Sequence, residues 1–267
     1  MNNIIELQNV TKTFLRKRWL SFHDGGNVVV AVDNVSLPVR EGEAVGLAGE
    51  SGCGKTTLGR LIAGLYQPTD GTVIVDGYNI NTGSREIRKR IRRDCRMIFQ
   101  NLDAALNPFM TVQQILEEPL RIHTSRSKKE IVRRIDEVLE LVNLPAAFRN
   151  EYPHTLSGGE KRRVSVARAI VVPPKILIAD EPVSALDVSI RAQIIDLFQR
   201  LREELKLTML FISHDLGVLN DVCSRLLVMY NGRIVEDTSI EHLRKRSLDH
   251  PYSKRLVESV LEIKVNS

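Results

Sequence analysis

The sequence predicts an α/β fold built on a parallel sheet, and three observations support this prediction. Short apolar runs typical of buried strands occur at 44–49, 175–180 and 209–212. Helical apolar spacing follows the first run, and a segment of helix length at 190–205 separates the other two. Strands that alternate with helices favour a parallel sheet, because a parallel pair needs a long crossover connection.

The N-terminal part opens with two extended segments, at 4–10 and 28–39, whose β-branched residues partly alternate with polar ones. They flank a basic, irregular stretch from Arg16 to Gly26. A helix is expected at 56–65, ending near a glycine and a proline. A further strand is expected at 72–75, because the Asp-Gly pair that follows it is typical of a tight turn.

The middle of the chain is expected to be mainly helical, from 101 to 172, after a short strand at 97–99. Its clearest amphipathic stretch is 132–142. Pro108 and Pro119 are expected to interrupt helices, since proline lacks the N–H that a helix interior uses.

A basic segment at 85–93 holds six Lys or Arg side chains in nine residues. No aromatic residues are interleaved with them, as they are in many surfaces that bind single-stranded nucleic acid. A solvated helix is therefore the preferred interpretation, and no nucleic-acid partner is expected.

Composition bounds the function only broadly. The 267 residues hold 38 Lys plus Arg and 33 Asp plus Glu, for a net charge of +5, which selects no class of partner. Three scattered cysteines without metal-ligand spacing argue against a disulfide framework or a zinc site, and favour a reducing compartment. No signal peptide and no apolar run of ~18 residues is recognisable, so we expect a soluble chain.

A glycine-rich loop between the strand at 44–49 and the following helix matches the phosphate-loop pattern G-x-x-x-x-G-K-[ST]. Glycines let successive backbone N–H groups turn toward phosphate oxygens, and the start of the helix adds positive potential. The lysine would reach the terminal phosphates, and the threonine hydroxyl would ligate Mg²⁺. The expected nucleotide-binding residues are Gly49, Glu50, Ser51, Gly52, Cys53, Gly54, Lys55, Thr56 and Thr57.

Two carboxylates, Asp180 and Glu181, end the apolar strand at 175–180. The carboxyl ends of parallel strands line the ligand crevice of an open α/β sheet. Asp180 would hold Mg²⁺ through water, and Glu181 would act as general base or orient the attacking water. An ordinary strand end is the alternative, and the phosphate loop upstream favours the functional interpretation.

A polar glycine turn, Ser157-Gly158-Gly159-Glu160, opens a further helix. Such a turn is suited to bind an anion at the helix N-terminus. It is equally typical of a helix cap in which Ser157 is the capping residue. The two interpretations are compatible.

These motifs together resemble the ATP-binding subunit of an ABC transporter, over nearly the whole chain. In order, they are GESGCGKT, MIFQ ending in Gln100, LSGGE, ILIADE, SALD ending in Asp187, and FISHD with His214. The resemblance implies that Gln100 links Mg²⁺ and the attacking water to the membrane partner. It implies that His214 contacts the γ-phosphate. Together with Thr56 and Asp180, Gln100 completes the expected metal site.

The resemblance also implies a P-loop NTPase architecture: a RecA-like parallel-sheet core with an N-terminal antiparallel β subdomain and a helical insertion. The whole chain, 1–267, would be one ATP-binding domain. Its expected parts are the β subdomain with the first part of the core at 1–100, the helical subdomain at 101–165, the rest of the core at 166–240 and a C-terminal helical tail at 241–267.

Adenine would stack on Phe14, which occupies the place of the family's aromatic residue. Trp19 and Phe22 are the alternatives, and a buried core role for Phe14 is equally compatible with the sequence.

The family works as a pair of such domains that close head to tail, with ATP between them. Ser157, Gly158 and Gly159 would then serve a phosphate loop on the partner, and Asp187 would lie in the loop that crosses between subunits. The LSGGE run at 156–160 is similar to the family's signature sequence. That signature usually ends in glutamine, whereas here it ends in Glu160. A carboxylate near a polyphosphate would weaken that site, unless Lys161 or Arg162 offsets its charge.

Several local sequences, including FQNLDAALNP, YPHTLSGG and HPYSK at 250–254, are similar to the oligopeptide, dipeptide and nickel import branch. The insertion from Leu15 to Val29 is similar to the second ATPase of such importers, which pairs with a distinct ATPase. The implied partners are that ATPase, two transmembrane permeases and, indirectly, an extracellular binding protein, at the cytoplasmic face of the membrane. No iron–sulfur cluster is expected, because no cysteine follows Cys223.

The implied activity is ATP hydrolysis that drives import of oligopeptides or dipeptides, with nickel or another metal chelate as the alternative cargo. A soluble ABC ATPase acting on nucleic acid or ribosomes is a remote alternative, since tandem cassettes and a coiled-coil insertion are absent from the sequence. A small-molecule kinase would leave LSGGE and SALD unexplained.

Overall fold

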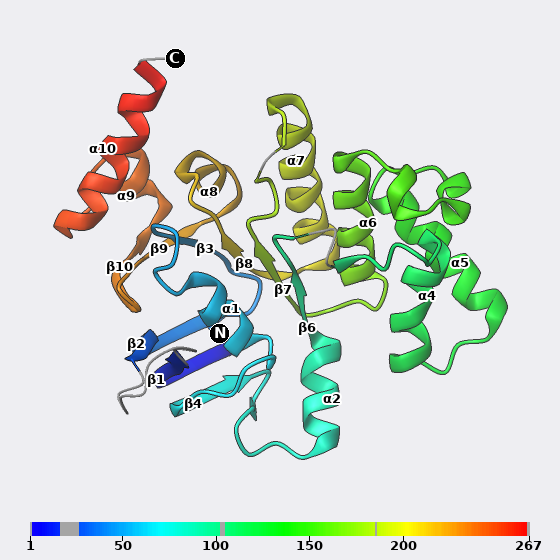
Figure 1. The fold of residues 1–267 in the computed structure, drawn as a ribbon, viewed down its shortest axis with the longest axis horizontal. Coiled ribbons are helices and arrows are strands. Elements are labelled where there is room, and N and C mark those ends of the chain that lie inside the picture. The colour runs from blue at the N-terminus through cyan, green and yellow to red at the C-terminus, as the bar shows by residue number, and fades with distance from the viewer. Residues whose placement is uncertain (1, 17–26, 102–104, 185, 266–267) are drawn as a thin grey trace, which may run out of the picture. The chain divides into compact units, whose positions relative to one another are not determined.

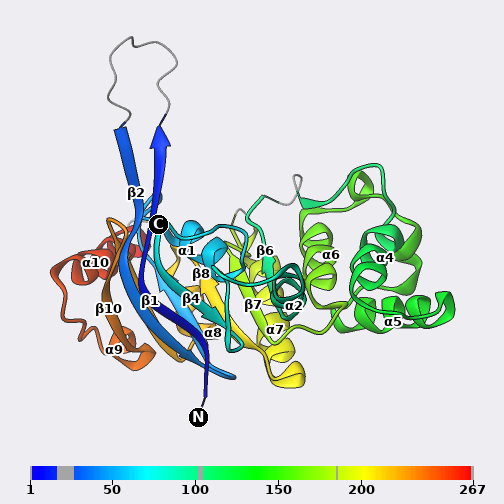
Figure 2. The same ribbon diagram turned by 90° about the horizontal axis from the view of Figure 1, so that it is seen from below.

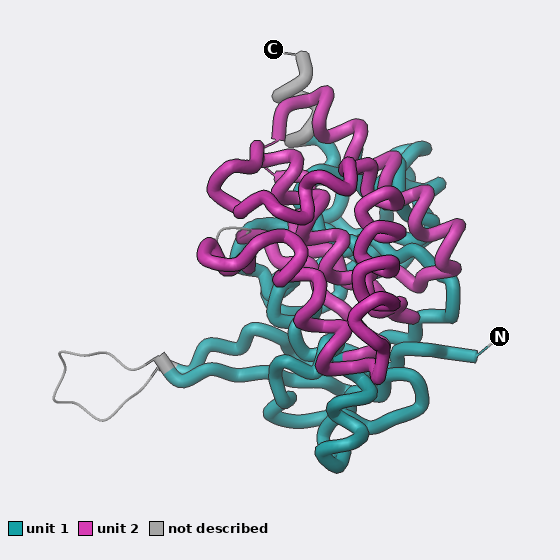
Figure 3. The backbone as a smooth tube through the Cα atoms, turned by 90° about the vertical axis from the view of Figure 1, so that its right-hand side faces the viewer, with its two compact units in different colours: residues 1–92, 210–267 teal, residues 93–209 magenta. Residues whose placement is uncertain are grey.

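The computed structural model describes residues 2–16, 27–101, 105–184 and 186–265. The chain divides into two compact units, residues 1–92 with 210–267 and residues 93–209 (Figure 3). We describe each unit by itself.

The first unit contains a four-stranded antiparallel sheet in the order β2-β1-β4-β5. Its strands are β1 (Asn3–Arg16), β2 (Asn27–Arg40), β4 (Asp70–Val75) and β5 (Tyr78–Asn79). The long strands β1 and β2 run side by side over their full length (Figure 2). Asp76 and Gly77, with φ values of 49° and 77°, make the turn that the sequence predicts between β4 and β5. This sheet confirms the predicted antiparallel β subdomain.

The second sheet contributes strands in the order β10-β9-β3-β8 to the first unit. These strands are β3 (Ala44–Ala48), β8 (Thr208–Ile212), β9 (Arg225–Tyr230) and β10 (Arg233–Ser239). Strands β3 and β9 are parallel, and β10 pairs with β9 in the antiparallel sense. The helices that lie wholly or mainly in this unit are α1 (Lys55–Ile62), α2 (Arg85–Asp94), α8 (Leu216–Val222), α9 (Ile240–Arg244) and α10 (Pro251–Val265) (Figure 1).

The second unit holds a parallel strand pair and most of the remaining helices. The strands are β6 (Cys95–Ile98) and β7 (Ile176–Asp180). The helices are α4 (Val112–His123), α5 (Lys128–Leu141), α6 (Gly158–Ile170) and α7 (Val188–Leu205), with two 3₁₀ turns at Ala146–Asn150 and Pro153–Thr155. The predicted combination of a parallel sheet and a mainly helical segment is confirmed.

The three short strands β3, β7 and β8 are buried at every position, as their continuous apolar sequences predict. Their burial contributes to the core, because burying a Val, Leu or Ile side chain stabilises by about 1.5–3 kcal/mol. The expected strand at 97–99 is found at Cys95–Ile98, so it starts two residues earlier and ends one residue earlier than predicted.

Pro119 does not interrupt its helix, so that expectation is wrong. It lies inside α4, on the buried face with Val112, Ile115, Leu116 and Leu120. Burial of this face, together with the capping box that Thr111 and Gln114 form at the N-terminus, offsets the hydrogen bond that proline cannot donate.

The basic helix α2 is confirmed at Arg85–Asp94. Among the helices of the described residues, none combines the length and apolar character needed to cross a bilayer. The three cysteines are buried and unpaired with one another.

Candidate functional site

The loop from Gly49 to Gly54 joins the buried strand β3 to helix α1 and has a backbone that only glycine accommodates at three positions. Gly49, Gly52 and Gly54 have φ values of 147°, 83° and 113°. A Cβ at Gly49 would overlap the carbonyl oxygen of Met229, and one at Gly54 would overlap that of Ala31. The backbone is therefore packed as tightly as a phosphate cradle requires, and the residues fit the nucleotide phosphates that the motif predicts.

Lys55, the first residue of α1, is buried and folded back onto this loop. Its Nζ donates to the carbonyl oxygens of Gly49 and Glu50, both at 2.7 Å, and lies 3.7 Å from the Cys53 sulfur. The amine is thus fixed over the backbone that would surround a phosphate. Thr56 and Thr57 follow it, half-buried in the first turn of α1.

Two contacts from outside the loop hold its backbone. The Gly232 N–H donates to the Cys53 carbonyl at 3.0 Å. The Glu50 N–H donates to the Tyr252 hydroxyl oxygen, also at 3.0 Å. Tyr252 belongs to the HPYSK segment, which is similar to the importer branch, and its contact with the loop is not predictable from the local sequence.

His214 lies just beyond the carboxyl end of β8, with an exposed side chain. The Ser213 N–H donates to the Leu47 carbonyl at 3.2 Å, which places the end of β8 beside the end of β3. His214 therefore follows a strand that ends at the same edge of the sheet as the phosphate loop, where parallel sheets bind ligands.

Phe14 lies on β1 with 37% of its surface exposed, so a fully buried core role is wrong. Its ring meets Tyr66 edge to face at 5.7 Å between centroids, and the Lys12 Nζ lies 5.2 Å from the ring centre. An exposed aromatic face is compatible with stacking on adenine. The alternatives, Trp19 and Phe22, lie outside the described residues.

In the second unit, Gln100, Asp180 and Glu181 lie at one edge of the β6–β7 pair. Ile98 pairs with Ala179 in parallel, so the residues that follow both strands leave the sheet on the same side. Asp180 and Glu181 are 1% and 8% exposed, whereas Gln100 is exposed. The structure therefore brings together the three residues that the sequence assigned to metal and water.

Glu181 has a backbone that the sequence did not predict. Its φ of 50° lies in the left-handed region, which costs a non-glycine residue of order 1 kcal/mol or more. The N–H and hydroxyl of Ser184 donate to its carbonyl oxygen at 3.3 and 2.9 Å. These bonds stabilise a tight turn that places the carboxylate immediately beyond the strand.

The signature turn is a complete capping box on α6. The Glu160 N–H donates to Ser157 Oγ at 3.3 Å, and the Glu160 carboxylate accepts from the Ser157 N–H and hydroxyl at 2.8 and 2.7 Å. The hydroxyl and the N–H of Ser157 hold the pKa of Glu160 below its usual range. The carboxylate is therefore ionised at neutral pH.

The two glycines of the signature differ in their surroundings. A Cβ on Gly158 would meet no described atom within 4 Å, whereas one on Gly159 would lie 3.0 Å from the Ile190 Cγ2 atom on α7. Gly159 thus packs tightly against α7 within the unit, and Gly158 faces open space that a ligand or partner can occupy.

Asp187 is exposed at the N-cap position of α7, and its side chain makes no capping bond to the described N–H groups of that helix. Asp and Asn usually occupy this position because they cap. Ala185, which belongs to the same SALD motif, lies outside the described residues.

Magnesium is bound by oxygen ligands and usually keeps several waters, with one or two carboxylates and substrate phosphates completing the shell. Asp180 and Thr56 are the right residue types for this. Within the described part of the chain, no group of three His, Cys, Asp or Glu side chains is placed to hold a metal by protein ligands alone.

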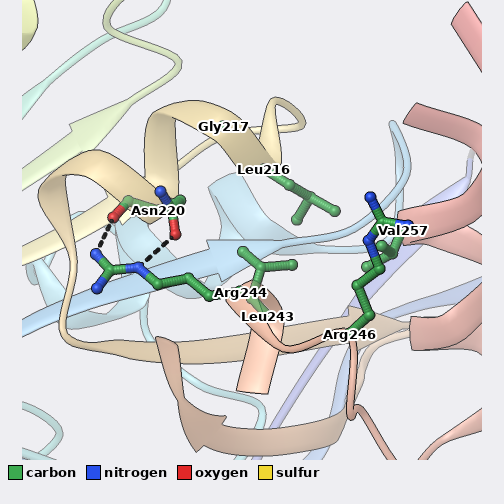
Figure 4. Close-up of a pocket in the computed structure, with 7 residues that line it drawn as sticks. All are labelled: Leu216, Gly217, Asn220, Leu243, Arg244, Arg246 and Val257. Atoms are coloured by element: carbon green, nitrogen blue, oxygen red, sulfur yellow. Dashed lines mark hydrogen bonds between the residues drawn. The ribbon is translucent and has the colours of Figure 1, made fainter. Parts of the chain in front are cut away.

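A separate pocket of about 320 Å³ lies between α8, α9 and α10 (Figure 4). The residues that line it are Leu216, Gly217, Asn220, Leu243, Arg244, Arg246 and Val257. None of the described phosphate-loop residues is among them, so this pocket is distinct from the predicted nucleotide-binding loop.

Comparison with known proteins gives consistent results. The family model described as ABC transporter matches residues 32–184. The oligopeptide transport ATP-binding protein AppF of Bacillus subtilis (strain 168) is 44% identical over 258 residues, which are 96% of this chain and 78% of AppF. The oligopeptide transport ATP-binding protein OppF of the same organism is 43% identical over 261 residues, 96% of this chain and 82% of OppF.

A similar solved structure is the dimeric post-hydrolysis state of the ATP-binding cassette MJ0796 bound to ADP and Pi. It has a TM-score of 0.78 and 33% sequence identity, and the match covers 88% of this chain and 98% of that one.

Proposed function

The chain belongs to the ABC transporter family, and on that premise we propose that it hydrolyses ATP to drive an importer of oligopeptides or dipeptides. The glycine cradle closed by Lys55 carries the nucleotide part of this proposal. The peptide cargo is supported by AppF and OppF, both named for oligopeptide transport, which match 96% of the chain.

We assign the residues of the first unit to the nucleotide. The backbone from Gly49 to Thr57 binds the phosphates, and Lys55 neutralises charge on the terminal ones. The Thr56 hydroxyl is a magnesium ligand. His214 contacts the γ-phosphate, and Phe14 stacks on adenine.

The residues of the second unit act on the same reaction. Asp180 would hold magnesium, and the bound ion would supply positive charge against the phosphates. Glu181 accepts a proton from the attacking water, or orients it, and its buried position at a strand end limits competing hydration. Gln100 would be a further magnesium ligand, and it would link the magnesium and the attacking water to the permease.

A second ATP-binding subunit completes the site. Ser157, Gly158, Gly159 and Asp187 are assigned to the nucleotide held by that partner, and the open space around Gly158 supports this. The dimeric form of the MJ0796 cassette, bound to ADP and Pi, is a precedent in a similar structure. We propose that the partner is a distinct ATPase chain.

The membrane partners are two transmembrane permeases, served by an extracellular substrate-binding protein. We propose that the helical part of the second unit docks on them, so that the chain is peripheral at the cytoplasmic face of the membrane. Phe109, just before α4, is 88% exposed, and such an exposed aromatic side chain is suited to bury against another protein.

The test uses the complex of this chain with the permeases and second ATPase encoded beside it, in proteoliposomes that contain the binding protein. We expect MgATP-dependent uptake of labelled di- and oligopeptides. The Glu181→Gln variant should still bind ATP, but it should lose at least about 100-fold in ATPase rate and lose uptake, because a general base typically contributes 10²–10⁴-fold.

Normal hydrolysis by Glu181→Gln would refute the role of Glu181. Uptake of nickel chelates in place of peptides would refute the cargo and leave the ATPase assignment intact. Co-purification of the wild-type chain with RNA or DNA, without permeases, would refute the importer.

A further inference from the structure

We propose that Tyr252, in the C-terminal helix, is a positioning residue for the phosphate loop and acts through a single peptide group on Lys55. The inference rests on the proposed ATP site and adds a residue from outside its motifs.

The peptide group between Gly49 and Glu50 carries hydrogen bonds on both sides. Its N–H, from Glu50, donates to the Tyr252 hydroxyl oxygen at 3.0 Å. Its carbonyl, from Gly49, accepts from Lys55 Nζ at 2.7 Å. Because a peptide group is planar, its N–H and carbonyl turn together. The tyrosine hydroxyl therefore fixes the orientation of the Gly49 carbonyl, one of the two carbonyls that hold the lysine.

Because residue 49 is a glycine, the peptide group between Gly49 and Glu50 depends on a hydrogen-bond partner to fix its orientation. This peptide turns about the Cα–C bond of Gly49, and because glycine has no Cβ, the residue itself restricts that rotation less than any other residue would. An external partner on the N–H supplies the restriction. Tyr252 is well placed to do so, because only 4% of its surface is exposed.

The ring of Tyr252 is itself held in place. It packs against the ring of Tyr230 on β9, with centroids 4.2 Å apart and planes tilted by 33°. Its own N–H donates to His250 Nδ1 at 3.2 Å. The side chain thus enters the loop from a fixed backbone, which is what precise positioning of the hydroxyl requires.

The start of α10 is anchored by Glu236 on β10. The carboxylate of Glu236 is buried and accepts from the N–H groups of Asp249 and His250, both at 2.9 Å. The preceding helix, α9, is tied to α8, since Arg244 Nε and an Nη atom donate to the side chain and carbonyl of Asn220, at 2.9 and 3.2 Å (Figure 4). Hydrogen bonds therefore join β10 to the start of α10 through Glu236, and α10 to the phosphate loop through Tyr252.

The experiment removes only the hydroxyl. Tyr252→Phe keeps the ring and its packing on Tyr230. We expect it to weaken binding of a fluorescent ATP analogue with Mg²⁺ to the full chain by about three- to tenfold, the range that one hydrogen bond represents. Tyr230→Phe is the matched control, because it removes a neighbouring hydroxyl that makes no hydrogen bond to the described loop residues, and the affinity of this variant should equal that of wild type.

A double variant separates positioning from general support of the fold. In a Lys55→Met background the affinity is lower, and we expect Tyr252→Phe to reduce it by less than a further twofold, because its effect passes through the lysine. Unfolding temperatures measured on all variants should change little between Tyr and Phe at position 252.

Equal affinity of Tyr252→Phe and wild type would overturn the proposal, as would an equal loss in both backgrounds. These outcomes are distinguishable from failure of the importer function. That function fails if the wild-type complex does not transport, whatever Tyr252 does to nucleotide binding in the isolated chain.

Discussion

The left-handed backbone of Glu181 is a local constraint with a functional consequence. A side chain placed one residue beyond a strand normally alternates in direction with its predecessor. The φ of 50° breaks that alternation directly after the buried Asp180. This backbone is compatible with the different roles proposed for the two adjacent carboxylates, Asp180 on the metal and Glu181 on the water. The hydrogen bonds from Ser184 offset part of the strain.

The structure supports the expected repulsion between Glu160 and a polyphosphate, because it indicates that Glu160 is negatively charged. The carboxylate is turned toward Ser157, whose hydroxyl and N–H lower its pKa, so the negative charge persists at neutral pH. We expect Glu160→Gln to raise the steady-state ATPase rate of the assembled complex about two- to fivefold, because a partly screened charge is worth about 0.5–1 kcal/mol. An unchanged rate would contradict repulsion.

The control for Glu160→Gln is the stability of the capping box that Ser157 and Glu160 form on α6. Glutamine also completes a capping box, so Glu160→Gln should leave the unfolding free energy of the isolated chain within about 0.5 kcal/mol. Ser157→Ala removes the cap and should cost about 1 kcal/mol. Chemical denaturation of both variants measures these changes and separates effects on helix α6 from effects on catalysis.

At the scale of single residues, the sequence predicted what depends on local spacing. The Gly49–Thr56 pattern, the carboxylates after β7 and the cap at Ser157 were recognisable, because each is a motif of neighbouring residues. The contact between Tyr252 and Glu50 was not, since it joins residues about 200 positions apart and has no local pattern. The backbone of Glu181 was missed for a different reason: positive φ at a non-glycine residue is decided by tertiary context.

At the scale of elements, the connection between β10 and α10 depends on one buried charge. Burial alone would raise the pKa of Glu236, but the N–H groups of Asp249 and His250, together with weaker contributions from Ser253 and the charge of His250, lower the pKa overall. A carboxyl whose pKa is lowered on folding stabilises the protein above its unfolded pKa, near 4.3, and this stabilisation is lost as the pH falls through the folded value.

We therefore expect Glu236→Gln to be less stable than wild type by about 1–2 kcal/mol at pH 7, and the difference to shrink as the pH falls below about 4.3, the unfolded pKa, toward the lowered folded value. Denaturation between pH 7 and 3.5 measures this. Glu241→Gln is the control: Glu241 is an exposed partner of Arg244 on α9, and its loss should cost less than about 0.5 kcal/mol. A difference that stays constant with pH would contradict the assigned role of the charge.

Element positions followed well from apolar periodicity, and the errors have physical causes. The buried strands β3, β7 and β8 are continuous apolar runs, so they were found almost to the residue. Pro119 was misjudged because the cost of a proline inside a helix is local, whereas the burial that offsets it comes from the other helices of the unit. The residues next to Pro119 in the sequence do not indicate which helices pack against it.

At the scale of the whole molecule, the chain carries one set of motifs divided between two compact units. The phosphate loop and His214 belong to the first, and Gln100, Asp180, Glu181 and the signature belong to the second. The parallel-sheet core and the β subdomain were predictable because each strand has its own pattern. The boundary between units was not, because it depends on which elements pack most closely. The expected subdivision of the chain into subdomains at 1–100, 101–165, 166–240 and 241–267 stays a prediction.

The last prediction concerns assembly. The Glu181→Gln variant should hold MgATP without hydrolysing it, and so should accumulate the closed pair of ATPases. If the partner is a distinct chain, this variant alone will stay monomeric with MgATP and will form a heterodimer only when the second ATPase is added. Size-exclusion chromatography with light scattering measures both states. A homodimer would contradict the distinct partner, and a monomer in every mixture would contradict the two-subunit site.

Gly158 supplies the matched control for that experiment. Because a Cβ there meets no described atom within 4 Å, Gly158→Glu should fold and bind MgATP through its own phosphate loop as the parent variant does. The added carboxylate would face the polyphosphate on the partner and should prevent the heterodimer. Gly159 is unsuitable for this purpose, since a side chain there would press on Ile190 and disturb the unit itself. Loss of assembly in Gly158→Glu, with nucleotide binding intact, would place the signature turn at the interface between subunits.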